Sequence, residues 1–395
     1  MADETSSSGA NLFDPASAAA PQAAYQNMLT AECPVHRSPF GGGAILTRYE
    51  DCMWALRHPE IFSSEMDVQM ALGTERPMIP QQIDPPAQTR YRKILDPQFS
   101  NRRMQKLVPA IRADAEALID KFIDAGECEF DSAFAIPLPC NAFLHLMGLP
   151  EDQLELFLEL KDGIIRPQMK TNDFEEAGRI RTQTGKRIYA YFEELIDERQ
   201  GSTGDDMMAY LVNAELDGEK LTRNDILDVC FLLLLAGLDT VTATLGCNVA
   251  YLASNPEQRR KLVGDPSKLD GAVEELLRWE TPVTGIPRVI KQDVTVRGVE
   301  LKKGEMVTLL LGASNLDEGE FACPASVDFD RDHNRHLAFG GGAHRCLGSH
   351  LARMELRTAL EVWHERIPDY EIKPGEIPRY SPGIREVQYL PLVWW

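Results

Sequence analysis

The segment from Phe339 to Gly348 places one cysteine, Cys346, behind three consecutive glycines. Glycines leave the backbone free to adopt positive φ and let another group approach it closely. From Leu347 to about Arg366 apolar residues recur at helical spacing, so Cys346 lies just before a helix N-terminus. The unpaired N–H groups and the dipole of that terminus stabilise a thiolate, which is a soft metal ligand. A lone cysteine is more often a small buried apolar residue, so the cysteine by itself leaves ligation open.

A second chemical feature is the acid–alcohol pair Asp239-Thr240, which stands inside a long apolar stretch directly after Ala236-Gly237-Leu238. Burying an acid and an alcohol in an apolar helix is costly unless both find partners. Gly237 weakens the helix but lets another group approach its backbone. The pair is therefore either a satisfied helix bulge with a structural aspartate or a proton-delivery pair beside an oxygen-binding site.

Regular elements must position these residues. Thr222, with Asp225 three residues later, predicts the start of the helix that carries the acid–alcohol pair, and Pro256 marks its end. The remaining pattern is dominated by helices with small separate sheets, a mainly α, α+β arrangement. Further helices are predicted at 104–122, 152–165 and 174–199, and strands at 44–47, 294–312 and 387–394.

Composition excludes several classes of protein. A net charge of -20 disfavours nucleic acid and anionic membranes as partners. The eight cysteines form no C-x-x-C pair, which argues against a disulfide scaffold or a zinc site and suits a reducing cytoplasm. The longest apolar run, 229–238, is well short of the roughly 20 residues of a membrane span. We expect a soluble cytoplasmic protein with a disordered tail at 1–22, which lacks the pattern of a signal peptide, and one domain at 23–395.

The pattern Phe339-x-x-Gly342-x-x-x-Cys346-x-Gly348 resembles the heme-binding signature of the cytochrome P450 family, and the similarity extends from about Tyr25 to the last residue. The resemblance implies a triangular helical prism that holds heme b between two long helices, with Cys346 as the iron ligand. The absence of an apolar anchor favours the soluble bacterial type. Gln88 stands where many relatives have His. The cofactor-binding residues that the resemblance implies are Gln88, Arg92, Ala236, Arg288, Phe339, Gly340, His344, Cys346 and Gly348.

The same resemblance assigns catalytic and structural roles. Thr240 would stabilise bound oxygen, and Asp239 would relay protons. Glu275 and Arg278 form an E-x-x-R pair, which on its own is usually a solvated surface pair. In the family this motif locks the core near the heme loop, and Arg331 is the expected third member.

The resemblance places the substrate pocket in regions that are apolar with a few hydroxyls. A hydrophobic small molecule, such as a terpenoid, a steroid or a lipid-like compound, is therefore the expected substrate. The end of the chain is similar to that of bacterial camphor hydroxylases, which hints at terpenoids. For Met66 and Met70, ordinary loop packing is the alternative to a place in the pocket. The expected pocket residues are Met66, Met70, Leu235, Val283, Thr284, Ile286 and Ile384.

We expect electrons to come from a separate partner, because the sequence contains no recognisable reductase segment. Basic residues on a strongly acidic protein would steer an acidic ferredoxin, itself served by a ferredoxin reductase, and solvated helix faces are the alternative explanation. The enzyme itself is expected to be a monomer. The basic residues are Arg102, Arg103, Lys106, Arg345, Arg353 and Arg357.

Three functions compete. The leading one is a heme-thiolate monooxygenase that uses O2 and inserts one oxygen atom into its substrate. The others are a peroxide-driven peroxygenase and a non-catalytic heme protein that senses gas or stores a ligand. Peroxygenases of the family typically replace the acid–alcohol pair, and a binding protein needs no proton relay. The intact pair Asp239-Thr240 therefore argues against both alternatives.

Overall fold

The computed structural model describes residues 15–38, 43–66, 73–171, 173–381 and 384–395. The chain divides into two compact units. The first comprises Met1–Ser64, Cys247–Cys346 and Ile377–Leu390, and the second comprises Glu65–Gly246, Leu347–Glu376 and Pro391–Trp395. The long helix α11, Arg223–Ser254, gives its larger part to the second unit and its last turns to the first.

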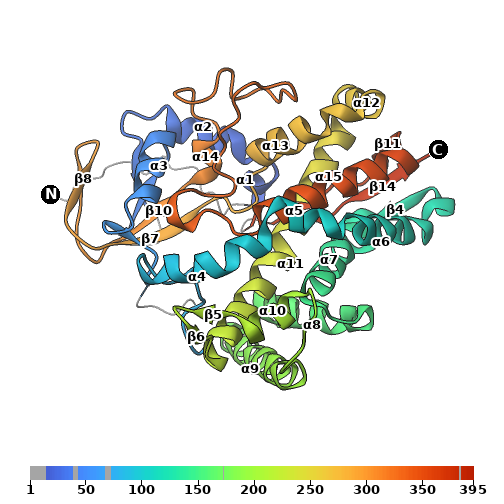
Figure 1. The fold of residues 1–395 in the computed structure, drawn as a ribbon. Coiled ribbons are helices and arrows are strands. Elements are labelled where there is room, and N and C mark those ends of the chain that lie inside the picture. Colours follow the sequence, from blue (N-terminus) through green and yellow to red (C-terminus); the bar gives the residue numbers. More distant parts are fainter. Residues whose placement is uncertain (1–14, 39–42, 67–72, 172, 382–383) are drawn as a thin grey trace. The chain divides into compact units, whose positions relative to one another are not determined.

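A five-stranded sheet of order β1-β2-β10-β7-β3 organises the first unit (Figure 1). Strands β2 and β10 are parallel, and the other neighbours are antiparallel. Two hairpins, β8-β9 and β12-β13, complete its strands. Its strands are β1 Val35–Arg37, β2 Ala44–Leu46, β3 Phe62–Ser63, β7 Ile286–Ile290, β8 Val294–Val296, β9 Val299–Leu301, β10 Met306–Leu309, β12 Arg379–Tyr380 and β13 Val387–Tyr389. Its helices are α1 Pro15–Ala19, α2 Pro21–Leu29, α3 Tyr49–Arg57, α12 Pro256–Gly264, α13 Leu269–Trp279 and α14 Leu311–Ser314.

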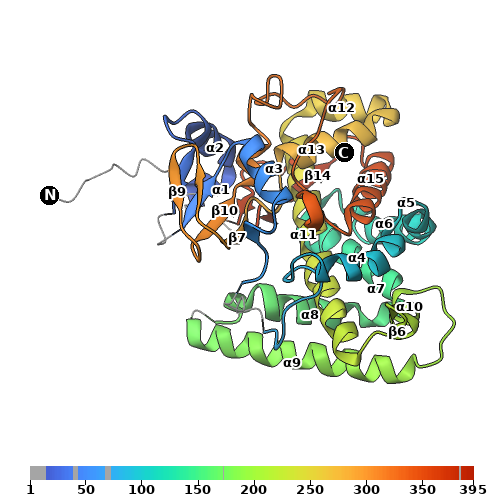
Figure 2. The same cartoon turned by 60° about the vertical axis from the view of Figure 1, so that its left-hand side comes forward.

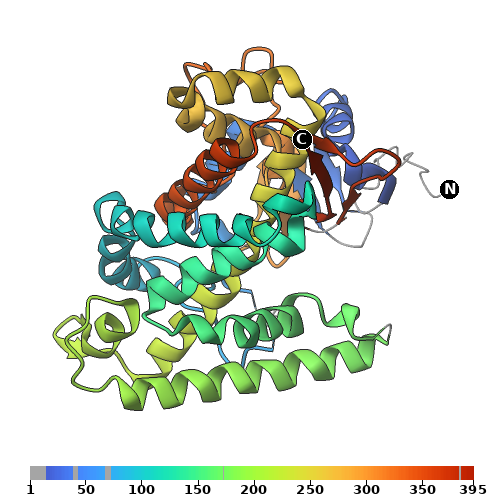
Figure 3. The ribbon, with the colours of Figure 1, turned by 90° about the vertical axis from the view of Figure 1, so that its right-hand side faces the viewer.

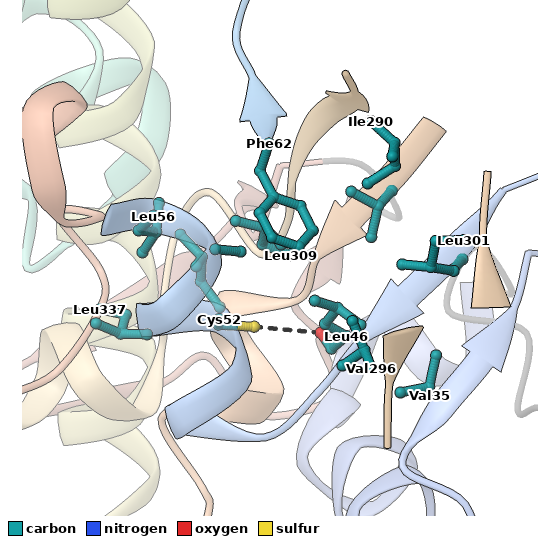
Figure 4. Packing of buried hydrophobic residues seen from close by; sticks show 14 residues of the cluster. Val35, Leu46, Cys52, Leu56, Phe62, Ile290, Val296, Leu301, Leu309 and Leu337 are labelled. Atoms are coloured by element: carbon teal, nitrogen blue, oxygen red, sulfur yellow. Dashed lines mark hydrogen bonds between the residues drawn. The ribbon is translucent and has the colours of Figure 1, made fainter. Parts of the chain in front are cut away.

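The apolar core of the first unit lies between this sheet and helix α3 (Figure 4). Leu46, Phe62 and Leu309 point from three strands into it, and all three are buried. The Cys52 thiol of α3 donates to the Leu46 carbonyl at 3.3 Å. Leu337, two residues before Phe339, belongs to the same cluster. The core therefore anchors the chain directly ahead of the glycine loop.

The second unit is mostly helical. Helix α15 packs along α6, and α8 lies beside the long helix α9 (Figures 2 and 3). A small sheet of order β11-β14-β4 is also present, and Trp363 of α15 packs edge-on against Phe130 at 4.8 Å between ring centroids. Its helices are α4 Ala87–Leu95, α5 Asn101–Met104, α6 Val108–Asp120, α7 Pro137–Met147, α8 Leu154–Ile165, α9 Phe174–Glu198, α10 Met207–Asn213 and α15 Ser349–Arg366. Its strands are β4 Glu127–Glu129, β5 Glu215–Leu216, β6 Glu219–Lys220, β11 Tyr370–Ile372 and β14 Pro391–Trp394.

The mainly α, α+β class is confirmed, and the predicted helices appear as α6, α8, α9, α11 and α15. The start of α11 has the expected capping box, because the amide of Thr222 donates to the carboxylate of Asp225 at 2.9 Å and the amide of Asp225 donates to the hydroxyl of Thr222 at 3.1 Å. Helix α11 is long and apolar enough to cross a membrane by composition, but 78% of its most apolar window is buried inside the protein, as in a core helix.

Several boundaries differ from the sequence prediction, and helix α6, predicted from residue 104, begins at Val108. Helix already begins at Pro15, inside the tail expected to be disordered. The strand predicted to reach 312 ends at Leu309, because the amide of Ser314 donates to the carbonyl of Leu310 and starts the helical turn α14. The final segment forms two strands, because β13 pairs with β12 whereas β14 pairs with β11 and β4.

Candidate active site

The glycine loop of the first unit is a tight turn that closes on itself. The amide of Cys346 donates to the carbonyl of Phe339 at 2.8 Å, and the amide of Gly340 donates to Leu337 at 2.8 Å. Gly340 and Gly342 have φ of 63° and 61°, a region that favours glycine. Cys346 itself is exposed. The fold therefore presents this cysteine at the surface of its unit and ties the backbone around it.

Gly342 is required by close approach as well as by its φ. A Cβ at this position would lie 1.9 Å from the carbonyl oxygen of Leu56, at the end of α3. Gly342→Ala should therefore displace the loop, at a cost of about 1–3 kcal/mol for the strained backbone alone plus the clash. We expect lower heme occupancy and a lower Tm, measured on purified protein. Gly298→Ala is the matched control, because Gly298 has φ of 83° with no atom within 4 Å of its Cβ position. Equal losses in both variants would contradict the close-approach argument.

A fully buried ion pair lies in the same unit as the glycine loop. The carboxylate of Glu275 accepts two bonds from Arg278, at 2.8 and 2.7 Å, and one from Arg331 at 3.0 Å. The side chains of Glu275 and Arg278 are 0% exposed. Burial would raise the pKa of Glu275, but the guanidinium groups of Arg278 and Arg331 outweigh burial and hold that pKa below its usual value. The E-x-x-R pair and its expected third member are thus one contact network in the structure.

Sequence reasoning missed the amide that joins this network to the glycine loop. Arg278 donates to the carbonyl of Asn315 at 2.9 Å, and the side chain of Asn315 accepts from the amide of Leu337 at 2.6 Å. Asn334 donates to Glu275 at 3.0 Å. Both are asparagines in loops, where a side-chain amide commonly ties down backbone. Their polar type in a loop was the only available signal, and it is weak for Asn334, whose neighbours His333 and Arg335 are also polar.

The acid–alcohol pair lies on helix α11 of the second unit. Asp239 is buried, and one of its carboxylate oxygens lies 2.6 Å from the guanidinium of Arg166 and 3.7 Å from the ammonium of Lys161. Asp162, which is 37% exposed, contacts the same two cations at 3.2 and 3.5 Å. The buried charge of Asp239 is therefore compensated, and the cations that hold it are shared with a carboxylate closer to solvent.

Arg166 and Lys161 were not singled out as site residues from the sequence. Lys161 follows buried Phe157 by four residues and precedes buried Ile164 by three, so it occupies the buried face of α8. A lysine on such a face needs an anionic partner. That periodicity is the signal that could have found it.

The residues of helix α11 beside this pair are less buried than the rest of the helix. Residues 226–234 and 241–250 are all buried, whereas Ala236 is exposed and Gly237 and Thr240 are half-buried. The Thr240 hydroxyl donates to the carbonyl of Ala236 at 3.0 Å, within an uninterrupted helix. A Cβ at Gly237 would meet only Phe143, at 3.7 Å. This apolar core helix is thus locally exposed at the residues where the resemblance places the cofactor.

The polar residues among the predicted cofactor-binding set are found in both units. Arg288 is buried on β7 and donates to the carbonyl of Pro287 at 2.7 Å, and His344 is half-buried in the glycine loop. In the second unit Gln88 is buried at the start of α4, and Arg92 pairs with Asp96 at 2.7 Å.

The predicted pocket residues in the described parts of the chain are neither core nor fully exposed. Met70 lies outside the described residues. A hollow of about 1000 Å³ lies elsewhere, between residues 73–75 and α9. Its lining includes the charged residues Glu75, Lys170 and Arg179, which do not match an apolar ligand. Met66, Leu235, Val283, Thr284, Ile286 and Ile384 are all half-buried.

The predicted basic surface is partly neutralised. Arg103 and Lys106 both contact Asp205, at 2.9 and 2.7 Å, and these cations lower the pKa of Asp205, with Lys106 contributing most. Arg357 pairs with Glu361 at 3.4 Å. Arg102 is exposed. The net positive charge available to a partner is smaller than the sequence alone indicates.

Comparison with known proteins identifies the family. The family model for cytochrome P450 matches residues 152–265 and 268–363. A probable cytochrome P450 127A1 of Sinorhizobium fredii is 36% identical over 339 residues, covering 85% of this chain and 80% of the relative. A steroid C26-monooxygenase of Mycobacterium tuberculosis is 33% identical over 353 residues, covering 89% and 87%. The crystal structure of CYP109E1 from Bacillus megaterium in complex with testosterone matches with a TM-score of 0.86 and 27% identity, covering 96% and 98%.

The chain therefore belongs to the cytochrome P450 family and is an oxidoreductase. Membership implies a heme-thiolate cofactor, and the residues present fit one. Cys346 is exposed at the end of a closed loop, and a Cβ at Gly348 would meet no atom within 4 Å. Ala236 on α11 is exposed in an otherwise buried stretch. A thiolate donor and open glycine backbone are what a flat, iron-containing macrocycle requires.

Proposed function

We propose that this protein is a heme-thiolate monooxygenase that inserts one oxygen atom from O2 into a hydrophobic small molecule, with electrons from a ferredoxin. The observation that carries the proposal is the pair Asp239-Thr240 beside the locally exposed residues of α11, with Asp239 held by Arg166 and Lys161. The bound heme would activate O2 for transfer to the substrate. The chain would hold it through Cys346, with Gln88, Arg92, Arg288 and His344 toward the propionates.

The protein's own groups would move protons. Asp239 would accept and release the proton, and its cations Arg166 and Lys161, which also contact the half-buried Asp162, would compensate its charge and fix its side chain. The hydroxyl of Thr240, the next residue, would hold the bound oxygen in place. A peroxygenase or a ligand-storage protein has no need of this arrangement, which is why we rank both below the monooxygenase.

The proposed substrate is apolar, of the terpenoid, steroid or lipid-like class, and the enzyme is proposed to act as a cytoplasmic monomer. The half-buried apolar side chains Val283, Ile286 and Ile384 in the first unit, and Leu235 in the second, support an apolar substrate. A relative named as a steroid monooxygenase and a structural neighbour solved with testosterone support the steroid class.

The test combines spectroscopy with turnover. The Soret band of the reduced carbon monoxide complex reports whether a thiolate ligates the iron, and a hydrophobic compound library is screened for ferric spin-state shifts. The best compound is then incubated with NADH, ferredoxin and ferredoxin reductase, or with hydrogen peroxide alone. Product that depends on ferredoxin supports the proposal. Equal product with peroxide alone indicates a peroxygenase, and no product in either case indicates a binding protein.

The basic residues predict where ferredoxin docks. Arg102→Glu with Arg103→Glu should slow the first electron transfer and flatten its dependence on ionic strength, because steering by opposite charge is screened by salt. Stopped-flow reduction under carbon monoxide measures the rate. Lys302→Glu with Lys303→Glu, at the turn after β9, changes the net charge equally and should leave the rate unaltered. Similar rates for both double variants would show that Arg102 and Arg103 do not contribute to docking.

A further inference from the structure

Arg385 is a buried arginine outside the heme-binding motifs. Its side chain is 5% exposed, and its Nε lies 2.6 Å from a carboxylate oxygen of Glu280, which is 7% exposed. The guanidinium also donates to the carbonyl of Ala18 and, at 3.3 Å, to that of Ala19. It stacks over the ring of Tyr380 at 4.5 Å. Desolvating an arginine and a glutamate is costly, so this ion pair adds little stability compared with an apolar pair. Its role is better explained by the chain segments that it holds in one relative position.

The segments that meet at Arg385 are those that carry predicted pocket residues of the first unit. Glu280 stands three residues before Val283, and Arg385 directly follows Ile384. The amide of Arg385 donates to the carbonyl of Pro282 at 2.9 Å, so the two segments are also joined through their backbones. Val283 and Ile384 are half-buried, whereas Pro282 and Arg385 beside them are buried. Each predicted pocket side chain thus adjoins a buried anchor.

The N-terminal helices hold the same segment from a second side. The hydroxyl of Tyr25 on α2 is hydrogen-bonded to the side chain of Thr284, and burial raises the pKa of Tyr25 to about 12, so this phenol stays neutral. The Tyr25 ring packs against Gly312, where a Cβ would come within 2.9 Å of it. The amide of Gly312 in turn donates to the carbonyl of Thr284 at 3.0 Å. Residues 15–29 therefore reach both pocket segments.

We propose that Arg385 is a positioning residue that sets substrate specificity. Through Glu280 and the carbonyls of Ala18 and Ala19 it fixes Ile384 against Val283, and so determines the shape of this part of the pocket wall. The inference rests on the proposed function, because it takes Val283 and Ile384 to face the substrate. A rigid ion pair with several carbonyl bonds suits this role, since it holds two chain segments in one relative position more strictly than apolar packing does.

The probe is 4-phenylimidazole, with imidazole as the reference, because both ligate ferric heme but only the larger one needs the pocket wall. The variants are Arg385→Met and the double variant Glu280→Leu with Arg385→Met, which leaves no buried charge unpaired if the single variant fails to fold. The ratio of the two dissociation constants should change by about tenfold, the lower end of the effect of one methylene in an apolar pocket. Imidazole binding alone should not change. Arg379→Met is the matched control, since Arg379 is exposed in the same hairpin and stacks on Tyr389 at 4.4 Å.

Val283→Ala and Ile384→Ala separate the two levels of the proposal. If both change the ratio and the Arg385 variants do too, the positioning role is supported. If both change it while the folded Arg385 variants keep the wild-type ratio, the positioning role is overturned and the pocket assignment stands. If neither changes it, these residues do not line the pocket, and the assignment on which the inference rests is overturned. A lower Tm without a change in the ratio would show a structural role only.

Discussion

Glu275→Ala is expected to destabilise the protein by about 3–5 kcal/mol, the range for removing one partner of a buried ion pair. The change leaves the fully buried guanidinium of Arg278 without its anion and removes the acceptor of Arg331, Asn334 and the amide of Asp328. The free energy of unfolding from chemical denaturation, followed by circular dichroism, measures the loss. Weaker heme retention should accompany it, because the network continues through Asn315 to Leu337.

Glu274→Ala is the matched control, since this neighbouring carboxylate is 29% exposed and contacts His336 at 3.2 Å. It should cost about 1 kcal/mol or less. A pH series adds a second check. Because the folded pKa of Glu275 lies below its usual 4.5, its contribution is present above that value and is lost as the pH falls through the folded pKa. Equal stabilities of the two variants near neutral pH would contradict the assigned role of Glu275.

Asp239→Asn is expected to lower kcat by about 10²–10⁴-fold, the usual contribution of a positioned acid–base group. An amide cannot relay protons, and it also loses the charge that Arg166 and Lys161 compensate. The dissociation constant of the substrate, taken from the spin-state titration, should remain near that of the wild type, because the change affects proton delivery. Product formation with ferredoxin and NADH, together with the solvent isotope effect on kcat, measures the result.

Asp162→Asn is the control for this change. Asp162 contacts the same two cations from a side chain that is 37% exposed, so water can take its place. We expect kcat to stay near the wild-type value in this variant. Similar kcat values for both variants would show that Asp239 only compensates charge, the structural alternative that the sequence left open.

Much of the site could be predicted from local sequence because its parts are local. Three glycines before Cys346 predict a close-approach turn, and the structure shows it at Gly342 against Leu56. Thr222 and Asp225 predict the start of α11 because a capping box involves only four residues. The short spacing of Glu275 and Arg278 puts them on one helix face, whatever surrounds them.

The tertiary structure decided which partners meet across long distances in the chain. Periodicity could not show that Arg166 would meet Asp239 or that Arg385 would meet Glu280 and Ala18, because such contacts depend on how distant elements pack. It likewise could not show that Asp205 neutralises Arg103 and Lys106. The sequence by itself determined the family, the cysteine that we propose as iron ligand and the helix that carries the acid–alcohol pair, since these depend on residue types at short fixed spacings. The tertiary structure also decided the environment of each charged side chain, because only the packed fold sets how strongly that side chain is desolvated and which opposite charge compensates it.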